Sequence, residues 1–96
     1  MATPGTIISA RRKELGKTQR DFAEDIGGSQ GLAWRLEHDR IVPSDDVIEK
    51  VARALELSAD TIYAALGKTP PDIRQMLARL SAEQLAELRA YLSAVT

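Results

Sequence analysis

The stretch from Thr18 to Pro43 holds two short helical patterns separated by so few residues that it constrains the rest of the fold. The hydroxyl of Thr18 can accept a free backbone N–H of the first helical turn, and Asp21 three residues later approximates a capping box. The apolar stripe of this helix is Phe22, Ala23 and Ile26. Gly27-Gly28 then ends the helix, because glycine readily adopts the left-handed conformation found at helix ends. Two helices joined so tightly must cross steeply, which predicts a helix-turn-helix.

The second helical pattern spans Gln30 to His38 and is capped by Ser29. At about 100° per residue, Leu32, Ala33 and Leu36 share one arc and should face the core. The opposing arc should face outward and holds Gln30, Gly31, Trp34, Arg35 and His38. This outer arc suits the major groove of DNA. Glutamine can make two hydrogen bonds to adenine, arginine can do so to guanine, and glycine allows close approach of the backbone.

The stretch resembles the Cro/repressor-type (XRE-type) helix-turn-helix regulators, which include the lambda-like phage repressors. The resemblance covers about Thr6 to Gly67 and rests on several short motifs that stand in register over this length. These are Arg12, Gln19, Phe22-Ala23, Ile26-Gly27, Ser29-Gln30, Leu36-Glu37 and Pro43. The resemblance implies an all-α protein whose five-helix lambda-repressor-like domain binds double-stranded DNA.

The resemblance also implies roles for polar residues around the motif. Arg12 would pair with Glu37 and tie the first helix to the recognition helix, residues 30–38. Gln19 would bind a phosphate and brace Gln30, and Arg40 is well placed in the following loop to meet another phosphate. The DNA-binding residues expected on these grounds are Gln19, Ser29, Gln30, Gly31, Trp34, Arg35 and Arg40.

Some positions depart from the family pattern or leave two interpretations open. Trp34 either packs over the loop from Asp39 to Val42 or makes an apolar contact to a thymine methyl. Asp39 stands where the family usually has glycine, and aspartate tolerates left-handed backbone less well. Gly28 and Ala33 are smaller than the usual residues at their places, so we expect the core to be repacked there.

The composition argues against several other classes of protein. With no cysteine, one histidine and no glycine-rich phosphate loop, the sequence predicts neither an enzyme nor a metal or cofactor site. It contains no run of about 18 apolar residues and no apolar signal region, so we expect a soluble cytoplasmic protein without a membrane partner.

The net charge of −1 is low for a DNA-binding protein, since strong binders are usually basic. The basic residues that cluster near the motif are Arg11, Arg12, Lys13, Lys17 and Arg20. We therefore expect few phosphate contacts per protomer, and an affinity that depends on assembly of two or more protomers.

Three further helices are expected in the same domain. Met1 to Gly5 should be a frayed tail, followed by a helix from Thr6 to Leu15. Ser44 and Ser58 should cap a fourth and a fifth helix, the last of which ends at Gly67.

A proline pair divides the chain into a DNA-binding domain, residues 1–68, and an oligomerisation segment, residues 69–96. Thr69 should cap the first helix of this segment, and Ser81 with Gln84 should form a capping box for the second. Apolar residues there repeat at coiled-coil-like spacing. The dimerisation residues expected are Leu77, Leu80, Leu85, Leu88, Leu92 and Val95. Either these helices form a homodimer or higher oligomer, or they fold back on the DNA-binding domain.

Two classes of function remain open from the sequence. The first is a sequence-specific transcriptional regulator, most simply a repressor that binds a palindromic operator as a dimer. The second is a protein-interaction module of the same fold, because some members of the resembled family are antitoxins or are controlled by a regulatory protein partner. The near-neutral charge and the C-terminal helices keep the second class open.

Overall fold

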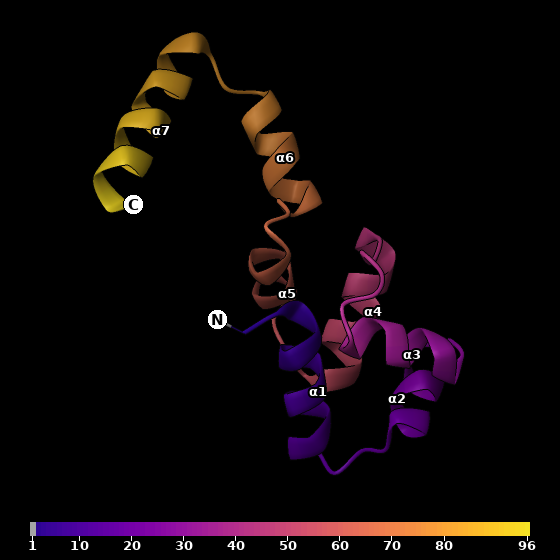
Figure 1. Ribbon diagram of the computed structural model, residues 1–96. Helices are drawn as coiled ribbons and strands as arrows, with labels where there is room; N and C mark the ends of the chain where they lie inside the picture. The colour runs from indigo at the N-terminus through magenta and orange to yellow at the C-terminus, as the bar shows by residue number, and fades with distance from the viewer. Residues whose placement is uncertain (1) are drawn as a thin grey trace.

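The computed structural model describes residues 2–96, and within them the chain forms seven α-helices and no strand (Figure 1). The helices are α1 Pro4–Glu14, α2 Gln19–Asp25, α3 Gln30–Glu37, α4 Asp45–Leu55, α5 Ala59–Leu66, α6 Pro71–Ala78 and α7 Ala82–Val95. The all-α prediction is confirmed.

Capping side chains begin most of the helices where the sequence predicts them. The hydroxyl of Thr18 accepts the backbone N–H of Asp21 at 3.0 Å, and the Asp21 carboxylate accepts that of Thr18 at 2.9 Å. Ser81 and Gln84 form the same reciprocal pair at the start of α7. Three further helices are capped by the hydroxyls of Ser29, Ser44 and Ser58.

The prediction of a frayed tail from Met1 to Gly5 is wrong for Thr3 to Gly5. Helix α1 already begins at Pro4, and the hydroxyl of Thr3 caps it by accepting the backbone N–H of Thr6 at 3.2 Å. Proline suits this first position because its fixed φ is helical and its missing N–H would have had no partner inside the helix. Met1 lies outside the described residues.

The first five helices enclose one apolar core, as the five-helix prediction requires. Helix α1 lies against α3, α4 and α5, and α2 lies against α3 and α4. The buried core consists of Ile8, Phe22, Ala23, Ile26, Ala33, Leu36, Ile48, Val51, Ala52, Leu55, Ile62 and Tyr63. Burial of these side chains from the first five helices fixes α3 with one face inside the protein and the other outside.

Small residues at two positions have a packing reason. A Cβ placed on Gly28 would lie 2.7 Å from Cδ2 of Leu32, so the leucine side chain occupies the space that a larger residue would need. Ala33 is fully buried. The turn between α2 and α3 is thus packed by Leu32 folding over Gly28.

Helices α6 and α7 leave the five-helix body and contain no buried residue. Figure 1 shows α7, at the yellow end of the chain, well apart from α1–α5. The chain is accordingly elongated, with extents of 49 × 25 × 22 Å. The alternative that both helices fold back on the five-helix body is therefore wrong, because α7 lies apart from it.

A cluster of polar side chains joins α6 to the body. The carboxylate of Asp45 accepts hydrogen bonds from Tyr63 Oη at 3.1 Å and Arg74 Nη2 at 2.7 Å, and Lys68 Nζ lies 2.9 Å away. These cations, Lys68 first and then Arg74, hold the pKa of Asp45 at about 2. Thr69 does not cap α6 as predicted, because Pro70 occupies the cap position without a side-chain bond, and the Thr69 carbonyl instead accepts from Arg74.

Candidate nucleic-acid interface

Helix α3 has one face in the core and one face in solvent. Ala33, Leu36 and Glu37 are buried, and the cap hydroxyl of Ser29 accepts the backbone N–H of Leu32 at 3.1 Å. The exposed face carries Gln30, Gly31, Trp34 and Arg35. Two polar side chains and an indole therefore point away from the protein, and the glycine leaves the backbone of the helix uncovered. This arrangement suits contact with the edges of bases.

The buried end of α3 is held by an ion pair. Arg12 Nε lies 2.8 Å from Oε2 of Glu37 and Arg12 Nη2 lies 2.9 Å from Oε1, while Arg12 Nη1 donates to the carbonyl of Lys17 at 2.8 Å. The two charged side chains are 12% and 3% exposed. The two parallel hydrogen bonds compensate the buried charges and fix α3 against α1 and the segment before α2.

Trp34 stacks on His38 at the end of α3. The ring centroids are 4.1 Å apart with an interplanar angle of 17°, and His38 Nδ1 lies 2.8 Å from the carbonyl oxygen of Trp34. The indole is still 44% exposed, and Val42 in the following loop is 76% exposed, so the indole does not cover that part of the loop. Trp34 and its neighbour Arg35 are both exposed on α3.

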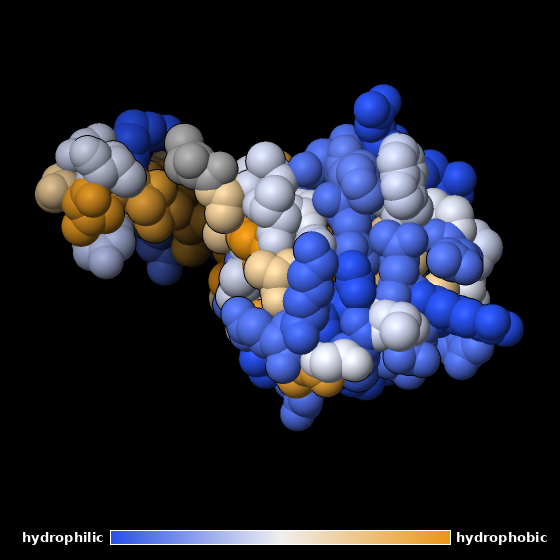
Figure 2. Space-filling view, turned by 60° about the horizontal axis from the view of Figure 1, so that its bottom comes forward, coloured by the Kyte–Doolittle hydropathy of each residue, from blue (hydrophilic) through white to orange (hydrophobic). Residues whose placement is uncertain are grey.

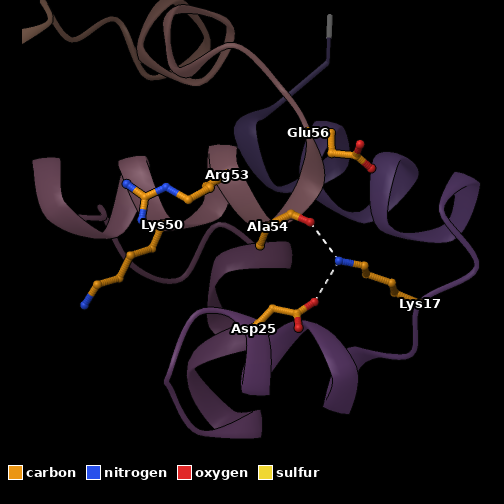
Figure 3. Close-up of a pocket in the computed structure, with 6 residues that line it drawn as sticks. All are labelled: Lys17, Asp25, Lys50, Arg53, Ala54 and Glu56. Atoms are coloured by element: carbon orange, nitrogen blue, oxygen red, sulfur yellow. Dashed lines mark hydrogen bonds and ion pairs between the residues drawn. The ribbon is translucent and has the colours of Figure 1, made fainter.

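Besides Arg12, two more of the basic residues near the motif make contacts within the protein. Arg11 Nε donates to the carbonyl of Leu55 at 2.9 Å. Figure 3 shows Lys17 reaching both the carboxylate of Asp25, at 2.7 Å, and the carbonyl of Ala54, at 2.8 Å. Both cations therefore stabilise the C-terminal end of α4, where carbonyls lack partners within the helix.

The pocket drawn in Figure 3 is an open hollow beside this contact. Lys50 and Arg53 line it but point away from Lys17, and Lys50 Nζ pairs with Asp46 at 3.0 Å. Across residues 2–96, no group of three or more His, Cys, Asp or Glu side chains is arranged to hold a metal ion. No helix in this part of the chain is long and apolar enough to cross a membrane.

The cations that remain exposed around α3 are few. With Arg11, Arg12 and Lys17 engaged internally, they are Lys13, Arg20, Arg35 and Arg40. Arg20 is 80% exposed and lies 3.8 Å from Glu24, which is at the limit of an ion pair. This small set agrees with the near-neutral charge of the whole chain.

The remaining predicted site residues lie at the edges of the exposed face. Gln19 is the first residue of α2 and is half-buried, and among residues 2–96 no hydrogen bond joins it to Gln30. The bracing of Gln30 implied by the resemblance therefore stays a prediction. Arg40 is exposed in the turn after α3. A Cβ on Gly31 would approach nothing closer than 3.7 Å, so the fold itself does not require glycine there.

One contact beside the site was missed from the sequence. Asp39 has a left-handed φ of 55°, and its Oδ1 accepts the backbone N–H of Gly5 at 2.8 Å. The available signal was an aspartate at a position where a left-handed residue is expected. It could not indicate the partner, because Gly5 lies 34 residues earlier in a segment that was expected to be frayed.

Comparison with known families matches residues 8–62 to the model described as Helix-turn-helix. This match covers more than half of the chain and includes α2, α3 and the pair of Arg12 with Glu37. The chain belongs to the helix-turn-helix family. The resemblance to XRE-type regulators in the sequence is thus confirmed.

This helix-turn-helix protein is similar to several curated regulators. An uncharacterized HTH-type transcriptional regulator of Mycobacterium tuberculosis is 31% identical over 67 residues, which are 70% of this chain and 48% of that protein. One from Methanothermobacter thermautotrophicus is 42% identical over 50 residues, 52% of this chain and 72% of that protein. YazB of Bacillus subtilis is 36% identical over 58 residues, 60% of this chain and 84% of that protein. The match thus spans about half the length of the mycobacterial relative.

A solved structure shares the fold over nearly the whole length. The SinR protein/SinI protein complex contains a chain that aligns with a TM-score of 0.61 at 22% identity, covering 95% of both chains. The likeness includes the C-terminal helices and not only the helix-turn-helix family match at residues 8–62. At this level of identity it concerns the fold alone.

Proposed function

We propose that this helix-turn-helix protein is a sequence-specific transcriptional regulator, most simply a repressor that binds a palindromic operator as a homodimer in the cytoplasm. The observation that carries the proposal is the exposed face of α3. Its opposite face belongs to the core, and Arg12 with Glu37 holds its buried end. A helix fixed in this way can enter the major groove without reorganising.

The residues of this face have distinct roles in the proposed complex. Gln30 reads adenine through two hydrogen bonds, Gly31 allows the backbone to approach the bases, and Trp34 contacts a thymine methyl or a sugar edge. Arg35 reads guanine or clamps a phosphate. Further phosphate contacts come from Gln19, Ser29 and Arg40.

Selection of binding sites from a random-sequence duplex library tests this proposal directly. Wild-type protein should enrich one palindrome, whose two half-sites lie about 34–36 Å apart. Gln30→Ala and Arg35→Ala should each weaken binding to the selected duplex by about 1–3 kcal/mol. On a scrambled duplex, Gln30→Ala should change binding less than Arg35→Ala. Failure to enrich any sequence would refute the proposal.

The salt dependence of binding provides a second measure. Each phosphate contact contributes about −0.9 to the slope of log affinity against log salt concentration. The four exposed cations Lys13, Arg20, Arg35 and Arg40 would then give a slope no steeper than about −4 per protomer. A much steeper slope would mean that a different surface contacts the backbone.

We propose that residues 69–96 form the dimer interface and residues 1–68 the DNA-binding domain. Figure 2 shows apolar surface gathered on the C-terminal part of the chain, at the left, beside a mainly hydrophilic body. Along α6, α7 and the short connection between them, the partly or fully exposed apolar residues assigned to the interface are Leu77, Leu80, Leu85, Leu88, Leu92 and Val95. Helices this short with an apolar face need a partner to bury it.

A second candidate function is supported by the fold likeness to a chain of the SinR protein/SinI protein complex. The C-terminal face of this chain would then receive a regulatory protein, or the chain would act as an antitoxin that holds a partner. Sedimentation of the purified protein separates the two candidates. A symmetric dimer favours the first, whereas a monomer that co-purifies with a partner encoded beside it favours the second.

A further inference from the structure

Two non-glycine residues in residues 2–96 adopt left-handed backbone, and they do so in the same kind of turn. Asp39 has φ 55° and follows α3, and Glu56 has φ 53° and follows α4. After each, the chain turns back: the N–H of Arg40 donates to the Arg35 carbonyl at 2.9 Å, and that of Leu57 donates to the Ala52 carbonyl at 2.9 Å. Both turns are the glycine-type helix ending, formed here without glycine.

The side chains of these two residues differ in what they contact. The carboxylate of Asp39 accepts the backbone N–H of Gly5 at 2.8 Å. Glu56 is exposed and no hydrogen bond from its side chain occurs within residues 2–96. Glu56 thus keeps the left-handed conformation with the backbone bonds of the helix end, whereas at Asp39 a side-chain bond is added to them.

Gly5 is shaped for this contact. It is buried in the first turn of α1, and a Cβ there would lie 2.4 Å from the Glu37 carbonyl oxygen and 2.9 Å from Oδ1 of Asp39. Its N–H is one of those that a helix start leaves without a partner inside the helix, and a carboxylate at this end is favoured by the helix dipole. The start of α1 and the end of α3 therefore touch, backbone against backbone.

The contact between Gly5 and Asp39 affects Arg40, the next residue in the chain. Because Asp39 is left-handed, the N–H of Arg40 returns to the Arg35 carbonyl, and this places Arg40 beside the last turn of α3. The Arg12–Glu37 pair fixes side chains one turn earlier but makes no bond to Arg40. The position of Arg40 thus depends on where the Asp39 backbone sits, and the bond from the Gly5 N–H to the Asp39 carboxylate holds that backbone against the start of α1.

We propose that Asp39 and Gly5 form a lock that positions Arg40 and the C-terminal end of α3 for DNA binding. Asp39 is a positioning residue and does not itself contact DNA. This inference rests on the proposed function, because Arg40 is a phosphate contact only if α3 enters the groove. It assigns a reason for aspartate where the resembled family usually has glycine.

The test uses the full chain, the duplex selected by wild-type protein and a scrambled duplex. Asp39→Gly relieves the backbone strain but removes the carboxylate, and it should lose about tenfold in affinity for the selected duplex. Glu56→Gly is the matched control, which relieves the same strain without losing a bond, and its affinity should stay within about twofold. Asp39→Asn keeps an oxygen acceptor and tolerates left-handed backbone, so it should recover most of the affinity.

A double-mutant cycle distinguishes positioning from a merely structural role. Arg40→Ala should weaken binding in the wild-type background and have little further effect in Asp39→Gly, because the turn that carries Arg40 is no longer held against α1 there. Gly5→Ala, which breaks the contact from the other side, should show the same coupling to Arg40→Ala. Additive losses would overturn the inference even if Asp39→Gly binds weakly.

Hydrogen exchange provides a check that needs no variant. The amide proton of Gly5 in wild-type protein should be protected from exchange although it lies in the first turn of a helix, and rapid exchange would overturn the lock.

The binding experiment distinguishes failure of this inference from failure of the proposed function. If wild-type protein discriminates the selected duplex but Asp39→Gly binds it equally well, only this inference fails. If wild-type protein does not discriminate, the proposed function itself fails.

Discussion

At the scale of single residues, Gly31 is a position where the fold does not require glycine but close approach to DNA would. A Cβ at this position would meet Arg35 Nη1 and Ser29 Oγ at 3.7 Å, an ordinary contact distance. Alanine is a better helix former than glycine, so Gly31→Ala should raise the free energy of unfolding by up to about 1 kcal/mol. If the backbone approaches the bases here, the same variant should weaken binding to the selected duplex. Urea unfolding and fluorescence polarisation measure the two effects, and unchanged binding would remove Gly31 from the interface.

The pair of Arg12 and Glu37 is the other residue-level feature with a large expected effect. Glu37→Ala would leave a largely buried guanidinium without its carboxylate, which should cost about 3–5 kcal/mol of stability. Thermal unfolding followed by circular dichroism should show a melting temperature lower by more than about 10 °C. The exposed pair of Arg20 and Glu24 is the control, and Glu24→Ala should cost less than about 1 kcal/mol. Overlapping melting curves for wild type and Glu37→Ala would contradict the bracing role.

At the scale of elements, the joint between α4, α5 and α6 makes stability depend on pH. The pKa of Asp45 is held at about 2 by Lys68 and Arg74, and the pKa of Tyr63 is raised by burial and by its bond to Asp45. Because the folded pKa of Asp45 lies below its unfolded value, its contribution is present above about pH 5 and is lost as pH falls toward 2.

Asp45→Asn tests this joint. Wild type should be more stable than the variant at neutral pH, and the difference in urea midpoint should shrink between about pH 5 and pH 2. The neighbouring Asp46 lies in the same helical turn but pairs only with Lys50 across an exposed face, so Asp46→Asn should change the midpoint much less. A difference that does not vary with pH would exclude Asp45 as the group responsible.

At the scale of the whole molecule, the exposed face of α7 predicts assembly. Leu88→Glu should give a monomer that stays helical, because the five-helix core contains no residue of α7. Its cooperative binding to a palindrome should be lost. Ala90→Glu adds the same charge about 200° around the helix and should leave the proposed dimer intact. Sedimentation measures both variants, and a stable dimer of a protein truncated after Lys68 would place the interface in α1–α5.

The sequence alone determined what depends on neighbours along the chain. Caps at Thr18, Ser29 and Ser81 and apolar residues at helical spacing are local signals, and they located α2, α3 and α7 closely. The same periodicity placed Gln30 and Arg35 on the exposed face of α3, because a residue's direction in a helix follows from its position alone.

Only the tertiary structure decided which polar groups meet across long separations. The bond between Gly5 and Asp39 and that between Asp45 and Arg74 join residues 34 and 29 positions apart. No local pattern encodes such partners, so Lys17 could not be distinguished in sequence from a cation that meets DNA. The start of α1 at Pro4 could not be predicted for the same reason, because the first turn of this helix is held by contact with the end of α3. Helices form from local preferences, but where their ends dock depends on how the whole core closes.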